Sequence, residues 1–522
     1  MAVTSFAAIC IGSYEVTLDV FEISRKNGIH CIDKIRHRIE LGRQPFANSG
    51  RISPEMVDEV CRVLRDFMKI VRMYRVSQVR AIATSAVREA SNDLFVLGKI
   101  RQMTGLEVQT LSNAEQRFLS YKAIASMEGR FSDMIRKGTA IVDLDGGSFQ
   151  LSVFDKSQLI TTQNMRQGSL RVREKLQALE AQTTEYETLV EELIRADTAS
   201  FRKMYLRDRK IENVILNGGL ISEIIFRDQK HRDRSTRIMD RAAFEDWYGQ
   251  IAGKSENELA SSSNISLESA SLFRPTAVIC HWMVSMLDAN MIWMPGTDLS
   301  RGLAYEFAEK NKLLKMSHNF GSDIITAARH MARRYAVSKA HIDNVDMMAT
   351  AIFDAMAGIH GMGSRDRLLL RITAMLLDVG KYISYANIGE NTCQIIMSNE
   401  FIGLSHMERE LIAQAARYTL DPLPEYEDFV LETSLDEQGY LKTASLAAIL
   451  RLANVMDRTR MQKVVSLRAE LKEHKLMLHA AVRRNYVLEQ GLMREAADFF
   501  SDVFGVQPVL KIRKNAGGEK QA

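Results

Sequence analysis

The sequence predicts an α/β fold of two lobes, followed by an all-α region and a small α+β unit at the C-terminal end. The lobes are predicted because a short apolar run that resembles a strand ends in a glycine turn three times, at Gly12-Ser13, Gly146-Gly147 and Gly218-Gly219. Glycine lets backbone N–H groups come close to an anion. A strand, a turn and a strand, repeated later in the chain, are typical of two lobes that close on a phosphate chain.

The run AIVDLDGGSFQL at residues 140–151 is the most informative of these elements. Its strand breaks into Gly146 and Gly147, and the hydroxyl residue Ser148 follows. Asp143 stands near the strand end, where its carboxylate could hold a metal ion or a metal-bound water. An ordinary tight turn between two strands would use the same glycines, so this motif alone leaves both interpretations open.

The other two turns add weight to the phosphate interpretation. AAICIGSYEVTLDVFE at residues 7–22 places Gly12 and Ser13 between two strand-like runs. VILNGGL at residues 214–220 runs from an apolar strand into Gly218 and Gly219, and a helical segment follows. We therefore expect the three turns to contribute backbone groups to one phosphate site.

The segment AIATSAVREASN at residues 81–92 resembles the one that marks the exopolyphosphatase / guanosine pentaphosphate phosphohydrolase (Ppx/GppA) family, whose relatives include acetate kinase, sugar kinases and actin. Other segments follow in the family's order, namely LSNAEQRFL, QGS, FRPTAV and GTDLSRG. The resemblance covers residues 1–310 and implies two actin-like lobes. From about residue 318 to residue 459 the chain resembles the HD-like helical domain of longer members.

Four domains follow from this resemblance and from the length of 522 residues. We expect actin-like lobe I at 1–128, actin-like lobe II at 129–310 and the helical HD-like domain at 311–462. Residues 463–522 are expected to form the small α+β unit, in which three alternating segments predict strands, MREAADFFSDVF predicts a helix and the tail is disordered.

The chemistry that the resemblance implies is attack of water on a terminal phosphoryl group, with Mg²⁺ and a carboxylate base. Glu115 in LSNAEQRFL is the candidate base, and its neighbour Gln116 stands where members usually carry a second glutamate. An amide cannot accept the proton, so the base is absent if the family's residue aligns with Gln116. The other interpretation of Glu115 is a solvent-facing residue near a helix N-terminus.

The segment TSAVREASN supplies further phosphate contacts in the family. Arg88 matches an arginine that would bind phosphate oxygens with its planar guanidinium. Thr84 and Ser85 could donate their hydroxyls to phosphate, although Ser85 could equally cap the helix that follows.

The chain departs from the family's pattern in both hairpins. Cys10 replaces an aspartate in the first hairpin, and a thiol is a poor ligand for Mg²⁺. In the second hairpin, Asp145 replaces a glycine, and Phe149 and Gln150 replace threonine and glutamate. Two outcomes are open: Asp143 and Asp145 jointly bind the metal, or the site binds phosphate weakly or not at all.

The HD-like region retains only part of a metal site. His341 and Asp378 match two family ligands, but Leu377 replaces the histidine that pairs with the aspartate. One imidazole and one carboxylate are too few for a catalytic metal site, so this domain is expected to be structural or regulatory. Asp457 and Arg458 are expected to form a surface charge pair.

The amino-acid composition bears on where the protein is expected to act and on its partners. Five scattered cysteines give no disulfide framework, and no run approaches the length of a membrane-spanning helix, which together favour a cytoplasmic protein without a membrane partner. The net charge of +4 does not by itself predict a polyanion partner, and no DNA partner is expected. Relatives with large helical C-terminal domains suggest a homodimer.

The function that the resemblance implies is hydrolysis of a phosphoanhydride, in either inorganic polyphosphate or guanosine pentaphosphate. The alternative is a catalytically weak or inactive protein of the same fold that binds polyphosphate or an alarmone and acts through its helical domain. A kinase-like phosphotransfer is a third possibility, for which the sequence offers no acceptor-site signature.

Overall fold

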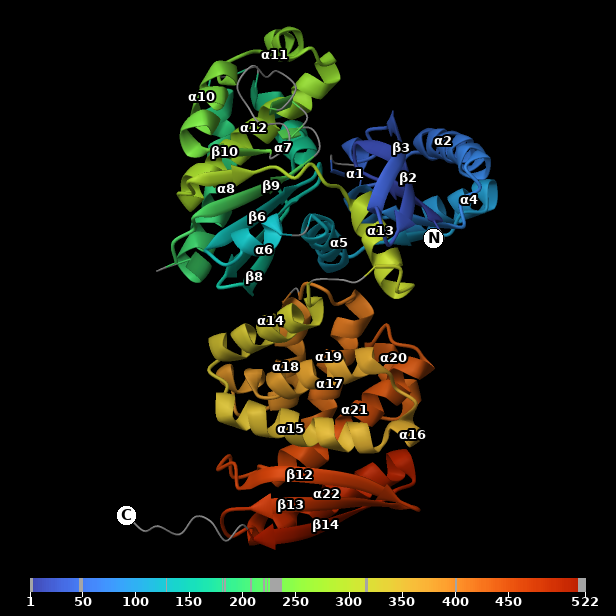
Figure 1. Cartoon of the computed structure of the whole chain (residues 1–522), viewed down its shortest axis with the longest axis vertical. Coiled ribbons are helices and arrows are strands. Elements are labelled where there is room, and N and C mark those ends of the chain that lie inside the picture. Colours follow the sequence, from blue (N-terminus) through green and yellow to red (C-terminus); the bar gives the residue numbers. More distant parts are fainter. Residues whose placement is uncertain are drawn as a thin grey trace. The chain divides into compact units, whose positions relative to one another are not determined.

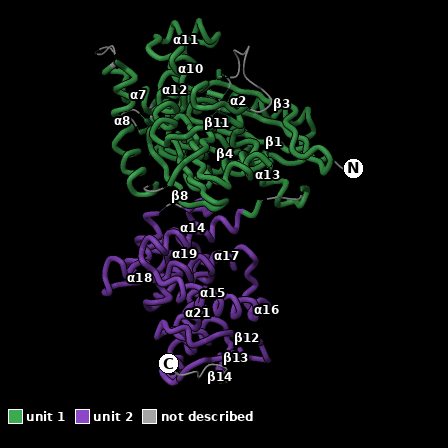
Figure 2. Tube along the Cα trace, turned by 60° about the vertical axis from the view of Figure 1, so that its left-hand side comes forward, with its two compact units in different colours: residues 1–319 green, residues 320–522 purple. Residues whose placement is uncertain are grey.

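The computed structural model describes residues 3–46, 50–127, 129–180, 182, 185–206, 209–218, 221–222, 224–225, 237–314, 318–399 and 401–514. The chain divides into two compact units, Met1–Asn319 and Phe320–Ala522 (Figure 2). The first unit contains both sheets that carry the predicted glycine turns. Gly219, predicted to bind phosphate, lies outside the described residues.

The first lobe is built on a five-stranded sheet of order β3-β2-β1-β4-β5 (Figure 1). The first three strands form an antiparallel meander, and β4 and β5 continue the sheet in parallel to β1. The strands are β1 (Thr4–Ile11), β2 (Glu15–Ser24), β3 (Gly28–Arg38), β4 (Gln78–Ala83) and β5 (Val108–Thr110).

Alternating apolar residues give this sheet two buried faces. Ala7, Ile9 and Ile11 of β1 face one core, which includes buried residues of α2 (Pro54–Met73) and α4 (Asp93–Thr104). Phe6, Ala8 and Cys10 face the other core, against α13 (Leu299–Lys310). Period-two alternation in a sheet covered on both sides explains why nearly every residue of β1 is buried. The short helices of this lobe are α1 (Arg43–Phe46) and α3 (Ser85–Arg88).

The second lobe repeats this topology in a six-stranded sheet of order β10-β11-β9-β6-β7-β8. Here β6, β7 and β8 form the antiparallel meander, and β9 and β11 run parallel to β6. The predicted repetition of strand, turn and strand is therefore confirmed. The strands are β6 (Thr139–Leu144), β7 (Phe149–Asp155), β8 (Gln158–Met165), β9 (Asn213–Asn217), β10 (Ile238–Asp240) and β11 (Met291–Trp293).

Helices cover the second sheet, and the longest of them, α12, buries an apolar series from Ala270 to Leu287 against it. The α8 helix ends in a π-helical turn, η1. The helices are α6 (Arg130–Met134), α7 (Ser169–Glu180), α8 (Tyr186–Phe201), η1 (Arg202–Leu206), α10 (Arg241–Ile251), α11 (Glu256–Ser263) and α12 (Leu267–Leu287).

Two helices, α5 (Asn113–Ala125) and α13, cross at very close range. A Cβ atom added to Gly302 would lie 2.2 Å from the carbonyl oxygen of Leu119. The crossing therefore requires glycine at position 302, because backbone atoms cannot move aside as a flexible side chain can. Since α5 begins beside the predicted site, this crossing fixes where its first turn lies.

Ion pairs and hydrogen bonds join the two lobes along one side. The guanidinium of Arg173 on α7 donates to both carboxylate oxygens of Glu40, at 3.1 and 3.0 Å. Arg38 of β3 donates to the hydroxyls of Ser266 and Ser269, at 2.6 and 2.5 Å. Bidentate contacts of this kind hold two surfaces in a defined orientation.

The second unit is helical and ends in a three-stranded sheet of order β12-β13-β14 with α22 (Figure 1). The three strands and the helix predicted from the sequence after residue 462 are present. The likeness of the helical part to HD domains and the finer domain boundaries stay predictions. The elements are α14 (Phe320–Arg334), α15 (Lys339–Ala355), α16 (Ala357–His360), α17 (Ser364–Leu376), η2 (Val379–Tyr382), α18 (Ile388–Ser398), α19 (His406–Leu420), α20 (Tyr426–Glu432), α21 (Glu437–Met456), β12 (Val464–Lys472), β13 (Lys475–Val482), α22 (Val487–Phe504) and β14 (Gln507–Lys514).

Within the described ranges, no helix is both long enough and apolar enough to cross a lipid bilayer.

The helix crossing generates a matched pair of glycine substitutions. We expect Gly302→Ala to lower the free energy of unfolding by about 1–3 kcal/mol, because the added methyl group would overlap the backbone of Leu119. Gly98→Ala on α4 is the control, since no atom lies within 4 Å of the added carbon, and it should be neutral or slightly stabilising. Thermal and denaturant unfolding measure both. Equal melting temperatures for the two variants would contradict the close crossing.

A buried carboxylate in the first lobe predicts a pH effect on stability. Asp19 of β2 is 1% exposed, and burial together with the charge of Asp298 raises its pKa to about 6. The folded protein therefore holds this proton more tightly than the unfolded chain, and the free energy of unfolding falls as pH rises from about 4 to about 6.

Replacing this carboxylate should remove the effect. We expect Asp19→Asn to be more stable than the parent protein at pH 7, by on the order of 1 kcal/mol, with the difference vanishing near pH 4. Asp66→Asn, at an exposed position on α2, is the control. Denaturant unfolding across this pH range measures both, and a difference independent of pH would refute the assignment.

Candidate functional site

The predicted phosphate-binding turns of both lobes meet in the structure. The hydroxyl oxygens of Ser13 and Ser85 lie 2.8 Å apart, and both residues are fully buried. A Cβ atom on Gly147 would lie 2.4 Å from the hydroxyl oxygen of Ser85, and one on Gly146 would lie 3.5 Å from the Cβ of Ser13. Residues predicted from three separate sequence segments are thus brought into direct contact.

Each turn is held by its own backbone hydrogen bond. The N–H of Gly12 donates to the carbonyl of Glu15 at 2.9 Å. The N–H of Asp145 donates to the carbonyl of Ser148 at 3.0 Å, which closes the β6–β7 turn. The N–H of Gly146 donates to the carboxylate of Asp145 at 2.7 Å. This N–H, which the sequence predicts to face phosphate, therefore binds an anion that the turn itself supplies.

A chain of hydrogen bonds crosses from Arg88 to this turn through Gln116. The guanidinium of Arg88 donates to the carbonyl of Leu111 at 2.7 Å and to the side-chain oxygen of Gln116 at 3.2 Å. The amide nitrogen of Gln116 donates to the carboxylate of Asp145 at 3.1 Å. Arg88 and Asp145 are thus linked by Gln116, which is 2% exposed.

The side chain of Glu115 points to Ser112 and not to Asp145. Its carboxylate accepts hydrogen bonds from the backbone N–H and the hydroxyl of Ser112, at 2.9 and 2.7 Å. The Ser112 hydroxyl in turn accepts from the N–H of Glu115 at 3.2 Å, so the pair forms a capping box. Successive helical residues point in directions about 100° apart, which places Gln116 rather than Glu115 against Asp145. The role of Glu115 as a base stays a prediction.

Asp143 lies at the end of β6 beside Asn217. The side-chain amide of Asn217 donates to Asp143 at 2.9 Å, and its carbonyl oxygen accepts from the hydroxyl of Thr297 at 3.1 Å. Burial raises the pKa of Asp143 to about 6, and the charge of Asp145 adds to this, whereas hydrogen bonds from Ser120 and Asn217 oppose it.

Asn217 is a site residue that the sequence prediction missed. It is the last residue of β9, directly before Gly218, and its position at the end of a parallel strand in VILN was the available signal. Gly218 lies next to the β6–β7 turn, since a Cβ there would contact the carbonyl oxygen of Leu144 at 3.4 Å.

Asp143 and Asp145 are the carboxylates that fit a magnesium ion. Mg²⁺ prefers oxygen ligands and commonly takes one or two carboxylates, with waters and substrate phosphates completing its shell. The described part of the chain holds no group of three or more His, Cys, Asp and Glu residues that could bind a metal by themselves. A magnesium ion here would therefore depend on phosphate oxygens from a substrate.

Three residues that depart from the family's pattern, Cys10, Phe149 and Gln150, are buried. Cys10 faces α13, where its sulfur lies 3.4 Å from the hydroxyl of Ser300, and burial raises the pKa of its thiol far above the usual range. Phe149 is fully buried in the core of the second lobe, and Gln150 is 2% exposed. The bulk of Phe149 therefore fills the core.

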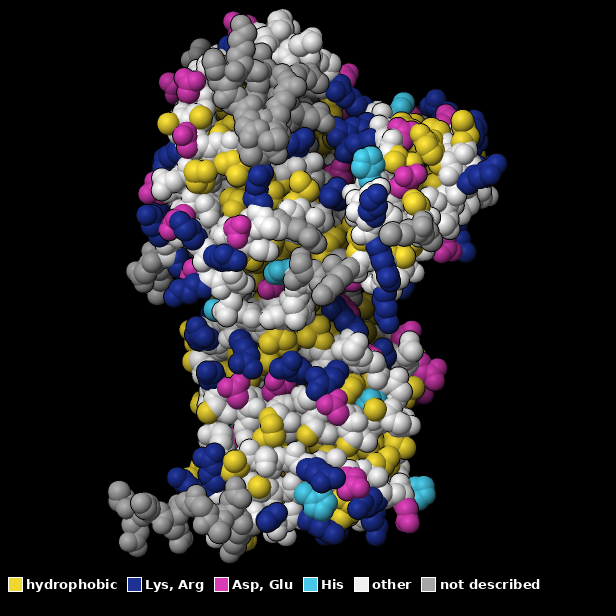
Figure 3. Space-filling view, viewed as in Figure 1, with side chains coloured by type: hydrophobic (Ala, Val, Ile, Leu, Met, Phe, Trp, Pro, Cys, Tyr) yellow, Lys and Arg dark blue, Asp and Glu magenta, His cyan; other side chains and the backbone are white. Residues whose placement is uncertain are grey.

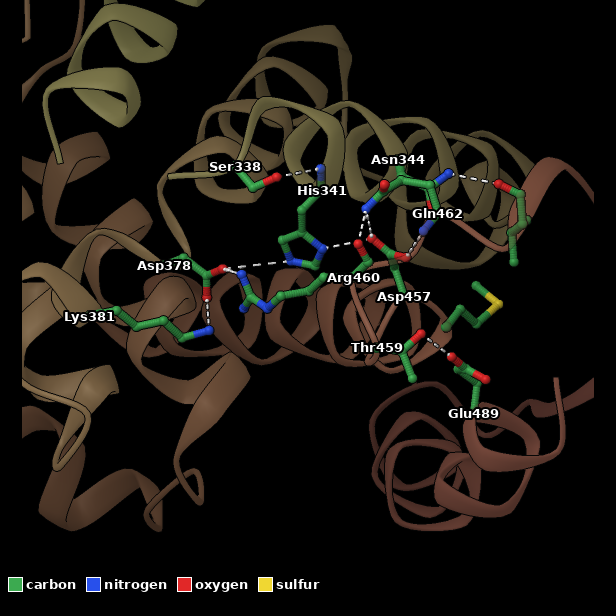
Figure 4. Close-up of polar contacts among 12 residues, drawn as sticks. Ser338, His341, Asn344, Asp378, Lys381, Asp457, Thr459, Arg460, Gln462 and Glu489 are labelled. Carbon is green, nitrogen blue, oxygen red and sulfur yellow. Dashed lines mark hydrogen bonds and ion pairs between the residues drawn. The ribbon is translucent and has the colours of Figure 1, made fainter. Parts of the chain in front are cut away.

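A second polar cluster lies in the second unit around His341 on α15 (Figure 4). Nδ1 of His341 lies 2.8 Å from a carboxylate oxygen of Asp457, and Nε2 lies 3.7 Å from a carboxylate oxygen of Asp378. Asp378 also pairs with Arg460, and with Lys381 at 2.8 Å. Burial acts to raise the pKa of Asp378, but the two cations outweigh it and hold that pKa below its usual value.

This geometry corrects one prediction and extends another. The expected surface pair of Asp457 and Arg458 is wrong, because Asp457 is 1% exposed and bonds to His341. The sequence identified His341 and Asp378 and missed Asp457 as their neighbour. Positively charged side chains accompany Asp378 where a metal site would place its ion, so this donor set does not fit a catalytic metal.

Comparison with known proteins gives two matches that together span most of the chain. Residues 20–311 match the Ppx/GppA phosphatase family, and residues 325–497 match domain III of Ppx/GppA phosphatases.

Individual relatives match over different lengths. The guanosine-5'-triphosphate,3'-diphosphate pyrophosphatase of Photobacterium profundum is 21% identical over 460 residues, which cover 86% of this chain and 85% of that protein. Exopolyphosphatase 1 of Mycobacterium tuberculosis is 31% identical over 142 residues, covering 27% of this chain and 40% of the relative.

A solved structure supports the fold of the first unit. The exopolyphosphatase from Cytophaga hutchinsonii aligns with a TM-score of 0.51 at 15% identity, over 60% of this chain and all of that one. At this identity the likeness concerns the fold alone.

The His341 cluster generates a stability prediction. We expect Arg460→Met to lower the free energy of unfolding of the second unit by about 1–2 kcal/mol, because the buried carboxylate of Asp378 loses one of its two cationic partners, Arg460 and Lys381. The folded pKa of Asp378 is lowered, so this stabilisation exists above about pH 4 and is lost as pH falls further. Arg458→Met, at an exposed neighbouring position, is the control. Denaturant unfolding would contradict the account if both variants behaved alike.

Proposed function

Because this chain belongs to the Ppx/GppA phosphatase family, we propose that it hydrolyses a terminal phosphoanhydride bond of inorganic polyphosphate or guanosine pentaphosphate. The observation that supports this most is the meeting of both glycine turns with Asp143, Asp145 and the Arg88–Gln116 chain in one place. Glycine backbone, a guanidinium and paired carboxylates are the groups that phosphoryl transfer with a metal requires.

Each group has a role in this proposal. Asp143, with the amide of Asn217 beside it, would hold Mg²⁺, which supplies positive charge against the phosphate oxygens. Arg88 would neutralise charge that develops on the transferred phosphoryl group. The turns at Gly12-Ser13 and Gly146-Gly147-Ser148, with Thr84, Ser85 and Gly218, would donate to the phosphate chain.

Two carboxylates compete for the role of the base. Glu115 would first have to leave both hydrogen bonds to Ser112. Asp145 already faces Gln116 across the site, at 3.1 Å. A glutamine cannot accept a proton, but its amide can orient an attacking water. We therefore assign water orientation to Gln116 and proton acceptance to Asp145, with Glu115 as the alternative base.

Phosphate can enter only if the two turns separate. Gly147 lies so close to Ser85 that not even a methyl group fits between them, and Asp145 occupies the N–H of Gly146. Opening would separate Gly146 and Gly147 from Ser13 and Ser85 and make room for phosphate between the turns. The two sheets have separate hydrophobic cores, which permits such a movement.

Some properties of the proposal rest on the sequence alone. The chemistry treats a polyphosphate end and the 5′-phosphate of guanosine pentaphosphate alike, so both remain candidate substrates. A homodimer, a cytoplasmic location and the absence of a DNA partner stay predictions.

The assignment is tested by phosphate release from long-chain polyphosphate and from guanosine pentaphosphate with Mg²⁺. We expect Asp145→Asn to lower kcat by about 100-fold or more, the loss that removal of a general base produces. Glu115→Gln should retain most activity and melt at a slightly lower temperature, because the weakened group is a helix cap.

The converse result, with Glu115→Gln inactive and Asp145→Asn active, would return the base to Glu115. If the parent protein binds either ligand but releases no phosphate, the hydrolase proposal fails and the binding role replaces it. Asp143→Asn should raise the Mg²⁺ concentration needed for half-maximal activity, which separates metal binding from proton acceptance.

A further inference from the structure

Arg171 on α7 of the second lobe contacts both lobes beside the glycine turns. Its Nε donates to the carbonyl of Gly147 at 2.9 Å, and a terminal guanidinium nitrogen donates to the carboxylate of Glu89 at 2.5 Å. The guanidinium also lies over the ring of Phe46, 4.1 Å from its centroid. Gly147 belongs to the second lobe, whereas Glu89 and Phe46 belong to the first. Figure 3 shows Lys and Arg side chains gathered between the two lobes, where α7 and α1 lie in Figure 1.

The beginning of α7 binds the carbonyls of the β6–β7 turn. The N–H of Ser169 donates to the carbonyl of Asp145 at 3.2 Å, and the N–H of Arg171 donates to the carbonyl of Gly146 at 3.0 Å. Together with the contact from Nε of Arg171 to Gly147, three successive carbonyls of the turn are hydrogen-bonded to α7. Arg171 supplies two of these three bonds.

These bonds determine which way the N–H groups of the turn point. In a planar trans peptide, a carbonyl and the N–H that follows it point in opposite directions. Because the carbonyls of residues 145–147 face α7, the N–H groups of Gly146, Gly147 and Ser148 point away from it. Within the described residues, the N–H groups of Gly147 and Ser148 donate to no acceptor. Successive N–H groups that point the same way form a concavity suited to an anion.

The first lobe restrains the side chain of Arg171. The ion pair with Glu89 is mostly buried on both sides, so solvent screens it less than an exposed pair. The ring of Phe46 covers one face of the guanidinium. Without these contacts, the long arginine side chain would regain rotational freedom and leave the Gly147 carbonyl for part of the time. The orientation of the turn is thereby coupled to the position of the first lobe.

We propose that Arg171 is a positioning residue, which directs the N–H groups of the β6–β7 turn at phosphate when the first lobe closes on it. This inference rests on the proposed function, in which those N–H groups donate to the phosphate chain. Arg171 itself binds no phosphate, because Gly147, Glu89 and Phe46 occupy its guanidinium. Loss of the Arg171 contact lets the Gly147 carbonyl turn toward the phosphate, where its oxygen repels the anion.

Arg173, two residues further along α7, offers a matched control. It also joins the lobes, through its bidentate ion pair with Glu40 at 3.1 and 3.0 Å. Its other hydrogen bonds within the described residues go to Glu174 and Ser271, and none goes to the β6–β7 turn. The two arginines therefore share the contact between lobes and differ in the contact with the turn.

The test compares Arg171→Lys with Arg173→Lys in the full chain. Both variants keep the net charge and replace a planar fork with a single ammonium group. Calorimetry with Mg²⁺ measures binding of methylene-bridged tripolyphosphate, which cannot be hydrolysed, and phosphate release from long-chain polyphosphate gives kcat and KM. We expect Arg171→Lys to bind the analogue about tenfold more weakly and to lose about tenfold or more in kcat, because the turn loses its orientation. Arg173→Lys should match the parent protein in both.

Removal of the acid from each pair gives a second readout, in which the sign of the effect is informative. Glu89→Ala removes a negative charge beside the site, and electrostatics alone would then strengthen binding of the analogue. We expect weaker binding instead, because Arg171 loses the partner that holds it. Glu40→Ala, which breaks the Arg173 pair, should bind the analogue as the parent protein does.

Three outcomes would overturn the proposal. Arg171→Lys could match the parent protein in both measurements. Arg171→Lys and Arg173→Lys could weaken binding and kcat alike, which would leave Arg171 as one of several contacts that join the lobes. Glu89→Ala could bind the analogue more tightly, which would identify Arg171 as a direct phosphate ligand. If Arg171→Lys and Glu89→Ala both weaken binding but the parent protein releases no phosphate, the positioning role holds and the hydrolase proposal alone fails.

Discussion

The contact on which the first unit depends is the one between the β6–β7 turn and Ser85. A Cβ atom on Gly147 would lie 2.4 Å from the Ser85 hydroxyl, so the turns of the two sheets meet backbone to side chain. The α5–α13 crossing at Gly302 holds α5 beside this contact, and the bidentate pair of Arg173 and Glu40 holds the lobes at their other side. Each sheet has its own core, and the hydrogen bonds from Arg38 to Ser266 and Ser269 add to these contacts between the lobes.

This packing brings two carboxylates, an amide and a guanidinium into one partly buried place. Burial makes ionised Asp143 costly, and Asp145 nearby adds to the cost. Two hydrogen bonds to Asp145, from the N–H of Gly146 and from the amide of Gln116, reduce the cost of its negative charge. Asp145 thus occupies donors that a phosphate oxygen would use, and its carboxylate acts as an internal anion in the closed state. A magnesium ion bound with a phosphate chain would replace both contacts and lower the cost of ionising Asp143.

The sequence was sufficient wherever the signal was local. Apolar runs that end in glycine predicted the repeated strand, turn and strand, because strand alternation and glycine turns are properties of neighbouring residues. The direction of Glu115 was also available, since Ser112 and Glu115 have the spacing of a capping box. Asp457 was not available, because its burial depends on α15 packing against the end of α21, and no pattern around residue 457 records that partner.

The two polar clusters of the chain neutralise their charges in opposite ways, and this difference separates their capacities. Around His341, the charge of Asp378 is balanced by Arg460 and Lys381, which are covalent parts of the chain and hold a carboxylate that is 4% exposed. A metal ion that bound Asp378 would displace Arg460 and Lys381 from this carboxylate. Both cations would then lie unpaired beside a buried site, which is strongly unfavourable. In the first unit the built-in group is the carboxylate of Asp145, which two hydrogen bonds hold where the turns of the two lobes meet. A phosphate oxygen that displaced the Asp145 carboxylate would gain the N–H of Gly146 and the amide of Gln116. The cluster at Asp145 can therefore exchange an internal anion for a phosphate ligand, whereas the cluster at His341 holds a fixed charge and stabilises the fold.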